Sequence, residues 1–285
     1  GGVQIVDPVE PAKAFSLPAG TTAGGKDLMA RIRCLPENCH EVLYLGVKKL
    51  VSYQDYRYAH QYLDRVQVLL ALEEPDSDNE LTREAARFLA LWMAFEDLPR
   101  VAQNKISAER FNRLREEVKA EAEQQVDMVE FLHPRVEEFC GVLPAGLGRY
   151  LQDSAVFSRL IGLFAKPRNV RTNGVFGYIT FYLMAGMRRF RRSSLIYQIE
   201  NGHIENWLDA VEQIARRDYA LALELAHCGR LVKGYGSTRE RGTRNLECIL
   251  GLIQQGLADS ADVVADLRSA ALEDDRGEAL QQLRA

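Results

Sequence analysis

Apolar residues recur at three- and four-residue steps along most of the chain from Glu41 onward, which is the spacing of one helical face. The clearest stripes lie in residues 41–70, 81–97, 106–123, 175–190, 195–217, 219–232 and 246–253. No stretch alternates apolar and polar residues long enough to indicate a strand. The pattern predicts an all-α fold, a single multi-helix domain of roughly eight to ten helices.

The first 36 residues interrupt any helical period. They contain four prolines and several glycines, namely Pro8, Pro11, Pro18, Pro36, Gly20, Gly24 and Gly25. Proline and glycine are the strongest local breakers of regular structure. We therefore expect residues 1–36 to form an irregular lead-in or linker, and residues 37–285 to form the helical domain.

Four tyrosines crowd the second predicted helical region, at Tyr53, Tyr56, Tyr58 and Tyr62. The preferred interpretation is packing at a seam between helices. A stacking platform for nucleic-acid bases would need basic residues interleaved on the same face, and only Arg57 and Arg65 are near.

The strongly apolar helix predicted for residues 175–190 ends in a run of four arginines: Arg188, Arg189, Arg191 and Arg192. Basic residues at a helix C-terminus complement the helix dipole, which is one explanation. Four arginines within five residues exceed what capping requires, so a partner or anion site is the alternative. The preceding stretch, residues 163–174, is predicted to be a cation-rich loop.

Residues 229–245, GRLVKGYGSTRERGTRN, are the only segment that is glycine-rich, basic and flanked by helices on both sides. The segment lacks the third glycine and the preceding strand of a dinucleotide fingerprint, and it is not a P-loop. Ser237 or Thr238 is expected to cap the following helix, whose free N–H groups suit an anion. The candidate anion or partner contacts are Lys233, Gly234, Tyr235, Gly236, Thr238, Arg239, Arg241 and Arg244. The competing interpretation is a helix–loop–helix corner whose arginines pair with acidic residues of the same chain.

Composition and charge narrow the function classes. The chain is 47% apolar and 27% charged, with a formal charge of −4, which disfavours a general polyanion binder. The charge is uneven, because residues 149–244 carry sixteen Lys and Arg against eight Asp and Glu. That half of the chain is suited to an acidic partner, or to the acidic remainder of the same protein.

Candidate catalytic and metal-binding groups are missing from the sequence. The five cysteines are widely spaced, and Cys34, Cys39 and His40 lack a second pair of ligands. No two histidines stand three or four residues apart, and neither GxSxG nor HExxH occurs. We expect no catalytic residue, metal site or cofactor in this chain. No apolar run approaches the ~20 residues of a membrane helix, and no signal peptide opens the chain, so we expect a cytoplasmic location and no membrane partner.

Five segments, in order, resemble the helical C-terminal region of the beta subunit of bacterial indolepyruvate oxidoreductase, a 2-oxoacid:acceptor oxidoreductase. The resemblance runs from about residue 28 to residue 257, and the stretch LVKGYG with the following threonine and Arg–Gly pair is its most distinctive part. The segments are LVSYQDYRYAHQYLDRV (50–66), LTREAARFLALWMAFED (81–97), EFLHPRVEEF (130–139), LPAGLGR (143–149) and DYALALELAHCGRLVKGYGSTRERGTRN (218–245).

The resemblance implies a domain of an enzyme complex that oxidatively decarboxylates aryl 2-oxoacids to acyl-CoA and passes the electrons to ferredoxin. In that family a gamma-type Rossmann-like domain precedes this region, and it is absent here. Thiamine diphosphate and the iron–sulfur clusters are expected in the partner alpha subunit. The implied partners are the gamma-type domain, the alpha subunit and an acidic ferredoxin.

Two hypotheses follow. In the first, the chain is a non-catalytic helical domain that serves assembly and partner docking in the oxidoreductase. In the second, it is a stand-alone interaction module whose two arginine groups converge to bind an anion or nucleic acid, with an affinity that falls steeply with salt.

Overall fold

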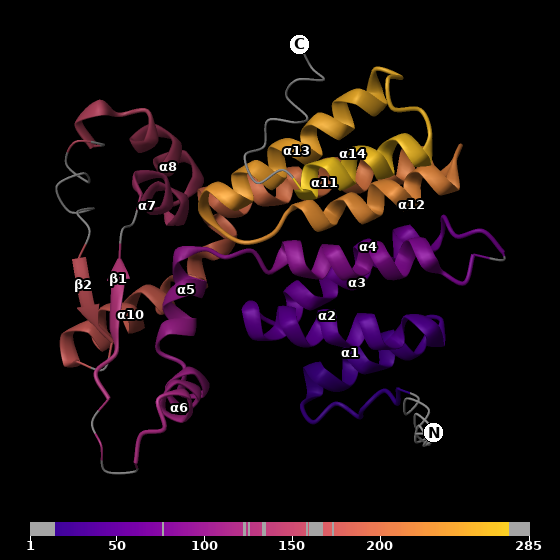
Figure 1. Cartoon of the computed structure of the whole chain (residues 1–285). Helices are drawn as coiled ribbons and strands as arrows, with labels where there is room; N and C mark the ends of the chain where they lie inside the picture. The colour runs from indigo at the N-terminus through magenta and orange to yellow at the C-terminus, as the bar shows by residue number, and fades with distance from the viewer. Residues whose placement is uncertain are drawn as a thin grey trace, which may run out of the picture. The chain divides into compact units, whose positions relative to one another are not determined.

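The computed structural model describes residues 15–75, 77–121, 124, 126–132, 135–157, 159, 168–172 and 174–273. These residues are mostly helical, so the all-α class is confirmed in its coarse form (Figure 1). Helices α1–α8 and α10–α14 together outnumber the eight to ten expected. The chain divides into two compact units, residues 1–87 and 88–285, with the boundary inside α4, whereas one domain was expected over residues 37–285.

The first unit contains helices from the amino-terminal third of the chain. They are α1 (Ala23–Arg33), the 3-10 turn η1 (Glu37–Cys39), α2 (His40–Tyr53), α3 (Tyr56–Leu70) and the first part of α4 (Glu80–Met93). Its core includes Leu28, Ile32, Leu43, Leu50, Leu63 and Val66, all almost fully buried.

Helix α1 corrects the expectation that residues 1–36 are irregular, at least for Ala23–Arg33. Thr22 begins the helix by accepting a hydrogen bond from the Gly25 backbone N–H. Gly24 lies inside the helix and packs against Tyr56. A Cβ added at Gly24 would lie only 2.9 Å from the Tyr56 ring. The glycine therefore serves close packing, which composition alone does not distinguish from a loop. Residues 1–14 of the expected lead-in lie outside the described residues.

The tyrosine cluster packs between helices, as predicted. Tyr53, Tyr58 and Tyr62 are fully buried, and only Tyr56 is exposed to a substantial degree. The Tyr62 hydroxyl donates to the Ala86 carbonyl at 3.2 Å, within the first unit. These rings belong to the core and offer no stacking platform.

The second unit contains the remaining helices and one small sheet. After α4 come α5 (Leu98–Lys105), α6 (Ala108–Glu117), β1 (Val129–Leu132), α7 (Val136–Val142), α8 (Ala145–Gln152), β2 (Arg168–Arg171), α10 (Val175–Gly186), η2 (Met187–Ser193), α11 (Leu195–Ala215), α12 (Tyr219–Cys228), η3 (Gly229–Leu231), α13 (Gly236–Gln254) and α14 (Ala261–Glu273). Helices α11 to α14 pack together, and α10 packs along α5 (Figure 1).

Strands β1 and β2 are a correction to the sequence analysis, which expected no strand and placed residues 163–174 in a loop. They pair antiparallel, with Val129 opposite Arg171 and Glu130 opposite Val170. Each strand has four residues and its partner lies more than thirty residues away in sequence, so no hairpin signal marks the pair. Strand β1 also buries its polar residue and exposes its apolar ones, the reverse of the usual arrangement. Glu130 is buried, while Val129 and Phe131 are exposed. Glu130 is buried because Lys105 and Arg110 both pair with its carboxylate.

Several helices begin at capping residues that can be recognised in the sequence. Asp97 caps α5 ahead of Pro99, and Asp218 caps α12, each by accepting a backbone N–H. Two expected ends are wrong. The α-helix at 175–190 stops at Gly186, and the arginine run forms the 3-10 segment η2. Helix α13 begins at Gly236 after Tyr235, so Ser237 and Thr238 lie inside its first turn and do not cap it.

Candidate functional site

The two predicted arginine groups each send one side chain into the interior of the second unit. Both reach residues 92–97, which comprise the last two residues of α4 and the segment that joins it to α5. Arg191 pairs with Asp97, and Arg239 lies over the Phe95 ring and pairs with a carboxylate that Trp92 also contacts. The sequence analysis left open whether these arginines serve an external anion or the chain's own acids. For these two, the structure places a carboxylate of the chain against the guanidinium.

Arg191 is buried in a two-point ion pair. Its Nε and Nη2 atoms donate to the two oxygens of Asp97 at 2.5 and 2.9 Å, and both side chains are almost fully enclosed. Two parallel hydrogen bonds between a guanidinium and a carboxylate are the strongest arrangement of this pair. Asp97 simultaneously caps α5 through the Arg100 N–H, so one carboxylate fixes both η2 and the start of α5.

Glu200 is the centre of a second buried cluster. Arg239 donates to its two carboxylate oxygens at 2.6 Å each, and the Trp92 indole N–H donates to one of them at 2.9 Å. Trp92 in turn packs against Trp207, with ring centroids 5.7 Å apart. The carboxylate is thus satisfied from α4 and α13 while it sits on α11. Its burial is possible because three hydrogen bonds replace water.

The glycines of residues 229–245 allow this corner to close. Gly234 and Gly236 adopt left-handed φ angles of 71° and 56°, which other residues rarely adopt. Gly242 of α13 packs directly on the backbone of η3, since an added Cβ would lie 2.1 Å from the Leu231 carbonyl oxygen. The Arg135 guanidinium lies over Gly236 and pairs with Glu240 at 3.2 Å. The segment is a tightly packed corner between α12 and α13.

The other predicted residues lie at or near the surface. Lys233, Gly234, Tyr235, Thr238 and Arg244 are exposed, and so are Arg188 and Arg189. Gly236, Arg192 and Arg241 are half-buried, and the two arginines interact within the chain. The structure therefore turns one arginine of each group inward, Arg191 and Arg239, and leaves Arg188 and Arg189 exposed on η2.

Sequence reasoning missed the acidic partners, Asp97 and Glu200, although each carries a signal. Glu200 lies on the apolar stripe of α11, in register with Ile204, Trp207 and Val211, where a carboxylate needs a buried partner. Asp97 precedes Leu98 and Pro99, the usual start of a helix. The identity of the arginine partners carries no such signal, because they come from 94 and 39 residues away.

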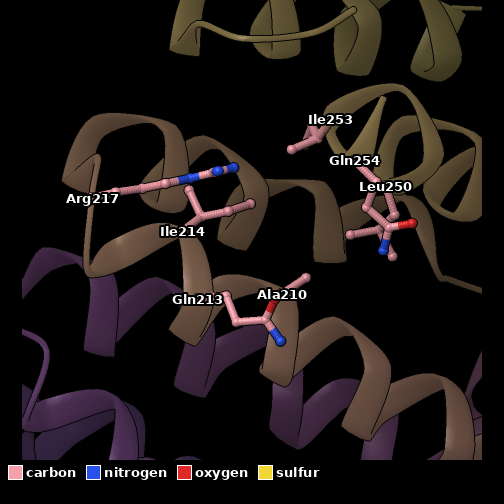
Figure 2. A pocket seen from close by; sticks show the side chains of 7 residues that line it. All are labelled: Ala210, Gln213, Ile214, Arg217, Leu250, Ile253 and Gln254. Atoms are coloured by element: carbon pink, nitrogen blue, oxygen red, sulfur yellow. The ribbon is translucent and has the colours of Figure 1, made fainter. Parts of the chain in front are cut away.

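The described surface is hollowed between α11 and α13, where two adjoining depressions have volumes of about 400 and 480 Å³. Three residues of α11, Ala210, Gln213 and Ile214, and Arg217 just after it face Leu250 and Gln254 of α13 there (Figure 2). None of the predicted site residues lines either depression.

The buried thiols are held in their neutral form. Burial raises the pKa of Cys228 to about 12 and that of Cys39 to about 11, and nearby Glu73 adds to the rise at Cys39. Burial also raises the pKa of Cys140 and of the Tyr62 hydroxyl. Nucleophilic attack requires the thiolate, so these thiols are poor nucleophiles near neutral pH.

The described residues contain neither a cluster of metal ligands nor a helix suited to cross a membrane. Among them, no three His, Cys, Asp or Glu side chains gather where they could hold a metal ion. Cys39 is buried while Cys34 is exposed, and the His40 ring contacts the Leu35 carbonyl. Of the helices in the described ranges, none combines the length and apolar character needed to cross a membrane.

The fold and this corner define a helical protein in which one arginine of each basic segment, Arg191 and Arg239, pairs with a carboxylate of the same chain. The model of DUF6537, a family of unknown function, matches residues 39–251, and the chain belongs to that family. Neither curated proteins nor solved structures give a match.

Proposed function

We propose that the chain is a non-catalytic helical domain of the beta subunit of an indolepyruvate (aryl 2-oxoacid):ferredoxin oxidoreductase. Its role is assembly and partner docking in a complex that decarboxylates the 2-oxoacid oxidatively to an acyl-CoA. The proposal starts from the resemblance of five ordered segments, of which residues 218–245 are the most distinctive.

The observation that carries the non-catalytic role is the use made of residues 218–245. Gly242 packs on the η3 backbone, and Arg239 is neutralised by Glu200 inside the unit. A side chain enclosed in this way contacts no substrate, so Arg239 and Gly242 serve architecture within the segment that carries the resemblance. The segment supports a domain that holds its shape for a partner.

The donor set of the chain supports placing the redox groups on another subunit. An iron–sulfur cluster needs thiolates from about four cysteines. Here Cys39, Cys140 and Cys228 are buried thiols with raised pKa values, and they come from η1, α7 and α12. The described residues do not fit a cluster, and we derive no electron-transfer step through this chain. By the resemblance, thiamine diphosphate and the clusters belong to the alpha subunit.

Co-purification tests the proposal. The chain, tagged and expressed in its native host, is expected to retain a thiamine diphosphate-containing alpha subunit in fixed ratio through two columns. The eluate should reduce ferredoxin in the presence of indolepyruvate and CoA. A chain that purifies without any oxidoreductase subunit and without this activity would contradict the proposal.

A further inference from the structure

Helix α10 has one face built into the second unit and one face built of exposed apolar side chains. The inner face contributes Phe181 and Ala185, which pack with Ala102 and Ile106 of α5. Gly177 lies directly against the β2 backbone, since an added Cβ would meet the Arg171 carbonyl oxygen. The helix is therefore firmly seated, and its outer face is held in place by the fold. Figure 1 shows α10 beside α5 and next to the sheet.

The outer face consists of six large apolar residues, which we call the α10 outer face. Their exposed fractions are 72% for Val175, 89% for Phe176, 42% for Tyr178, 48% for Ile179, 62% for Tyr182 and 66% for Leu183. At 100° per residue these positions span one continuous arc of about 160°, so they form a single surface. Tyr178 and Tyr182 stack with ring centroids 6.3 Å apart, which fixes part of this surface in advance.

The area of this face is large for an isolated monomer. With roughly 150–200 Å² offered by each full side chain, the six residues together expose on the order of 600–700 Å². The largest apolar patch of a typical monomer is about 300–600 Å², and one side of a standard protein interface is about 800 Å². The face therefore exceeds the usual patch of a monomer and approaches one side of a standard interface in size.

The stretch of sequence that contains the face carries charge of one sign, although Asp127 pairs with Arg171 of the adjoining strand β2. The sequence contains no Asp or Glu from Ser154 to Ile199, on either side of α10. Arg188 and Arg189 follow the helix directly and are exposed on η2. A surface that docks here with carboxylates at its edge would gain attraction and meet no like charge from this stretch.

The residue types favour a protein over a membrane. Residues 175–193 contain aromatic residues, methionine and arginine but no Lys, Asp or Glu. Enrichment in aromatics, Met and Arg with depletion of Lys and acids is typical of protein interface cores. A membrane-surface helix also combines a cationic edge with apolar side chains, so the absence of Lys in residues 175–193 is the feature that favours a protein here.

We propose that the α10 outer face, together with Arg188 and Arg189, docks a second protein whose surface is apolar at its centre and carries Asp or Glu at its edge. A second copy of this chain fits less well, because the same acid-free stretch would face itself and supply no carboxylate. The inference rests on the proposed function only for the identity of the partner, which would then be another part of the oxidoreductase complex.

Site-specific photo-crosslinking of the full chain in its native host tests the inference. The photoreactive residue p-benzoylphenylalanine replaces Phe176, and crosslinked peptides are identified by mass spectrometry. The expected result is one adduct with a different protein, on a peptide that carries Asp or Glu beside apolar residues. Leu183→Asp should lower the adduct yield at least about tenfold, as expected for loss of a central apolar contact.

A matched control isolates the face from general effects of a surface charge. Leu257 follows α13 and is 65% exposed, nearly the same as Leu183 at 66%, so Leu257→Asp should leave the yield within about twofold. Arg189→Glu should also lower the yield and weaken its decrease with added NaCl. Thermal melts confirm that each variant folds.

The outcomes separate the two proposals. An adduct with a subunit of the oxidoreductase supports both. An adduct with an unrelated protein, at an acidic apolar surface and sensitive to Leu183→Asp, keeps the docking face and contradicts the proposed function. An adduct with a second copy, a lipid or nothing, or one insensitive to Leu183→Asp, overturns the docking inference.

Discussion

Arg189 and Arg191 are two positions apart on η2 and lie in opposite environments. The first is exposed, and the second is enclosed against Asp97. Their sequence context is the same basic run, so the run predicts a cationic segment without indicating which member turns inward. The distinction depends on a carboxylate 94 residues away.

Replacing each arginine by methionine tests this difference. Arg191→Met leaves the Asp97 carboxylate buried without its partner. We expect the free energy of unfolding to be about 3–5 kcal/mol lower than in the wild type. Arg189→Met should change stability by no more than about 0.5 kcal/mol. Urea denaturation followed by tryptophan fluorescence measures both, because Trp92 and Trp207 lie in the second unit. Equal effects of the two substitutions would contradict the buried pair.

The buried thiols predict a dependence of stability on pH. Cys39 has its pKa raised from 9.0 to about 11 in the folded chain, so the unfolded chain loses this proton first. The free energy of unfolding should be insensitive to this group below pH 9 and should fall as pH rises from 9 towards 11. The fall attributable to Cys39 is at most about 1.4 kcal/mol per pH unit. Cys39→Ala should show a shallower decline than the wild type over this window, and identical slopes would argue against the burial.

At the scale of elements, the helical periods predicted most of the helices, because each stripe of apolar residues is a local signal. Helices α3, α4, α11 and α12 lie where their stripes do. Helix α1 and the two strands were not predictable in this way. Gly24 in α1 packs against the Tyr56 ring, and β1 pairs with a strand far along the chain. Their causes are tertiary contacts, which a local pattern does not contain.

Two helical glycines, Gly242 and Gly202, differ in whether the fold has room for a side chain at their position. Gly242→Ala places a Cβ 2.1 Å from the Leu231 carbonyl oxygen, and we expect a loss of about 1–3 kcal/mol as α13 moves away from η3. Gly202→Ala in α11 meets no atom within 4 Å, and better helix propensity should stabilise the chain by about 0.5–1 kcal/mol. Thermal or urea denaturation of the pair measures the difference, and a stabilising Gly242→Ala would refute the tight corner.

At the scale of the molecule, the Lys and Arg side chains of residues 149–244 lie in two kinds of environment. Some are neutralised within the chain, as Arg191 is by Asp97 and Arg239 by Glu200. Others, such as Arg189, remain at the surface next to α10 in sequence. The sequence predicted both the charge asymmetry and the apolar helix. It did not predict that the helix keeps most of its apolar residues exposed, because periodicity does not record what a face packs against.

From the exposed face and the internally paired arginines we propose a domain that contributes shape and contact to a larger assembly. That is the central claim, and deletion in the native host measures it most directly. The enzyme lacking residues 37–285 of this chain is compared with the intact enzyme for the mass of the assembled complex and for indolepyruvate-dependent reduction of ferredoxin. We predict that the deletion dissociates the complex and abolishes most of the turnover. A truncated enzyme that assembles fully and turns over at the intact rate would contradict the account.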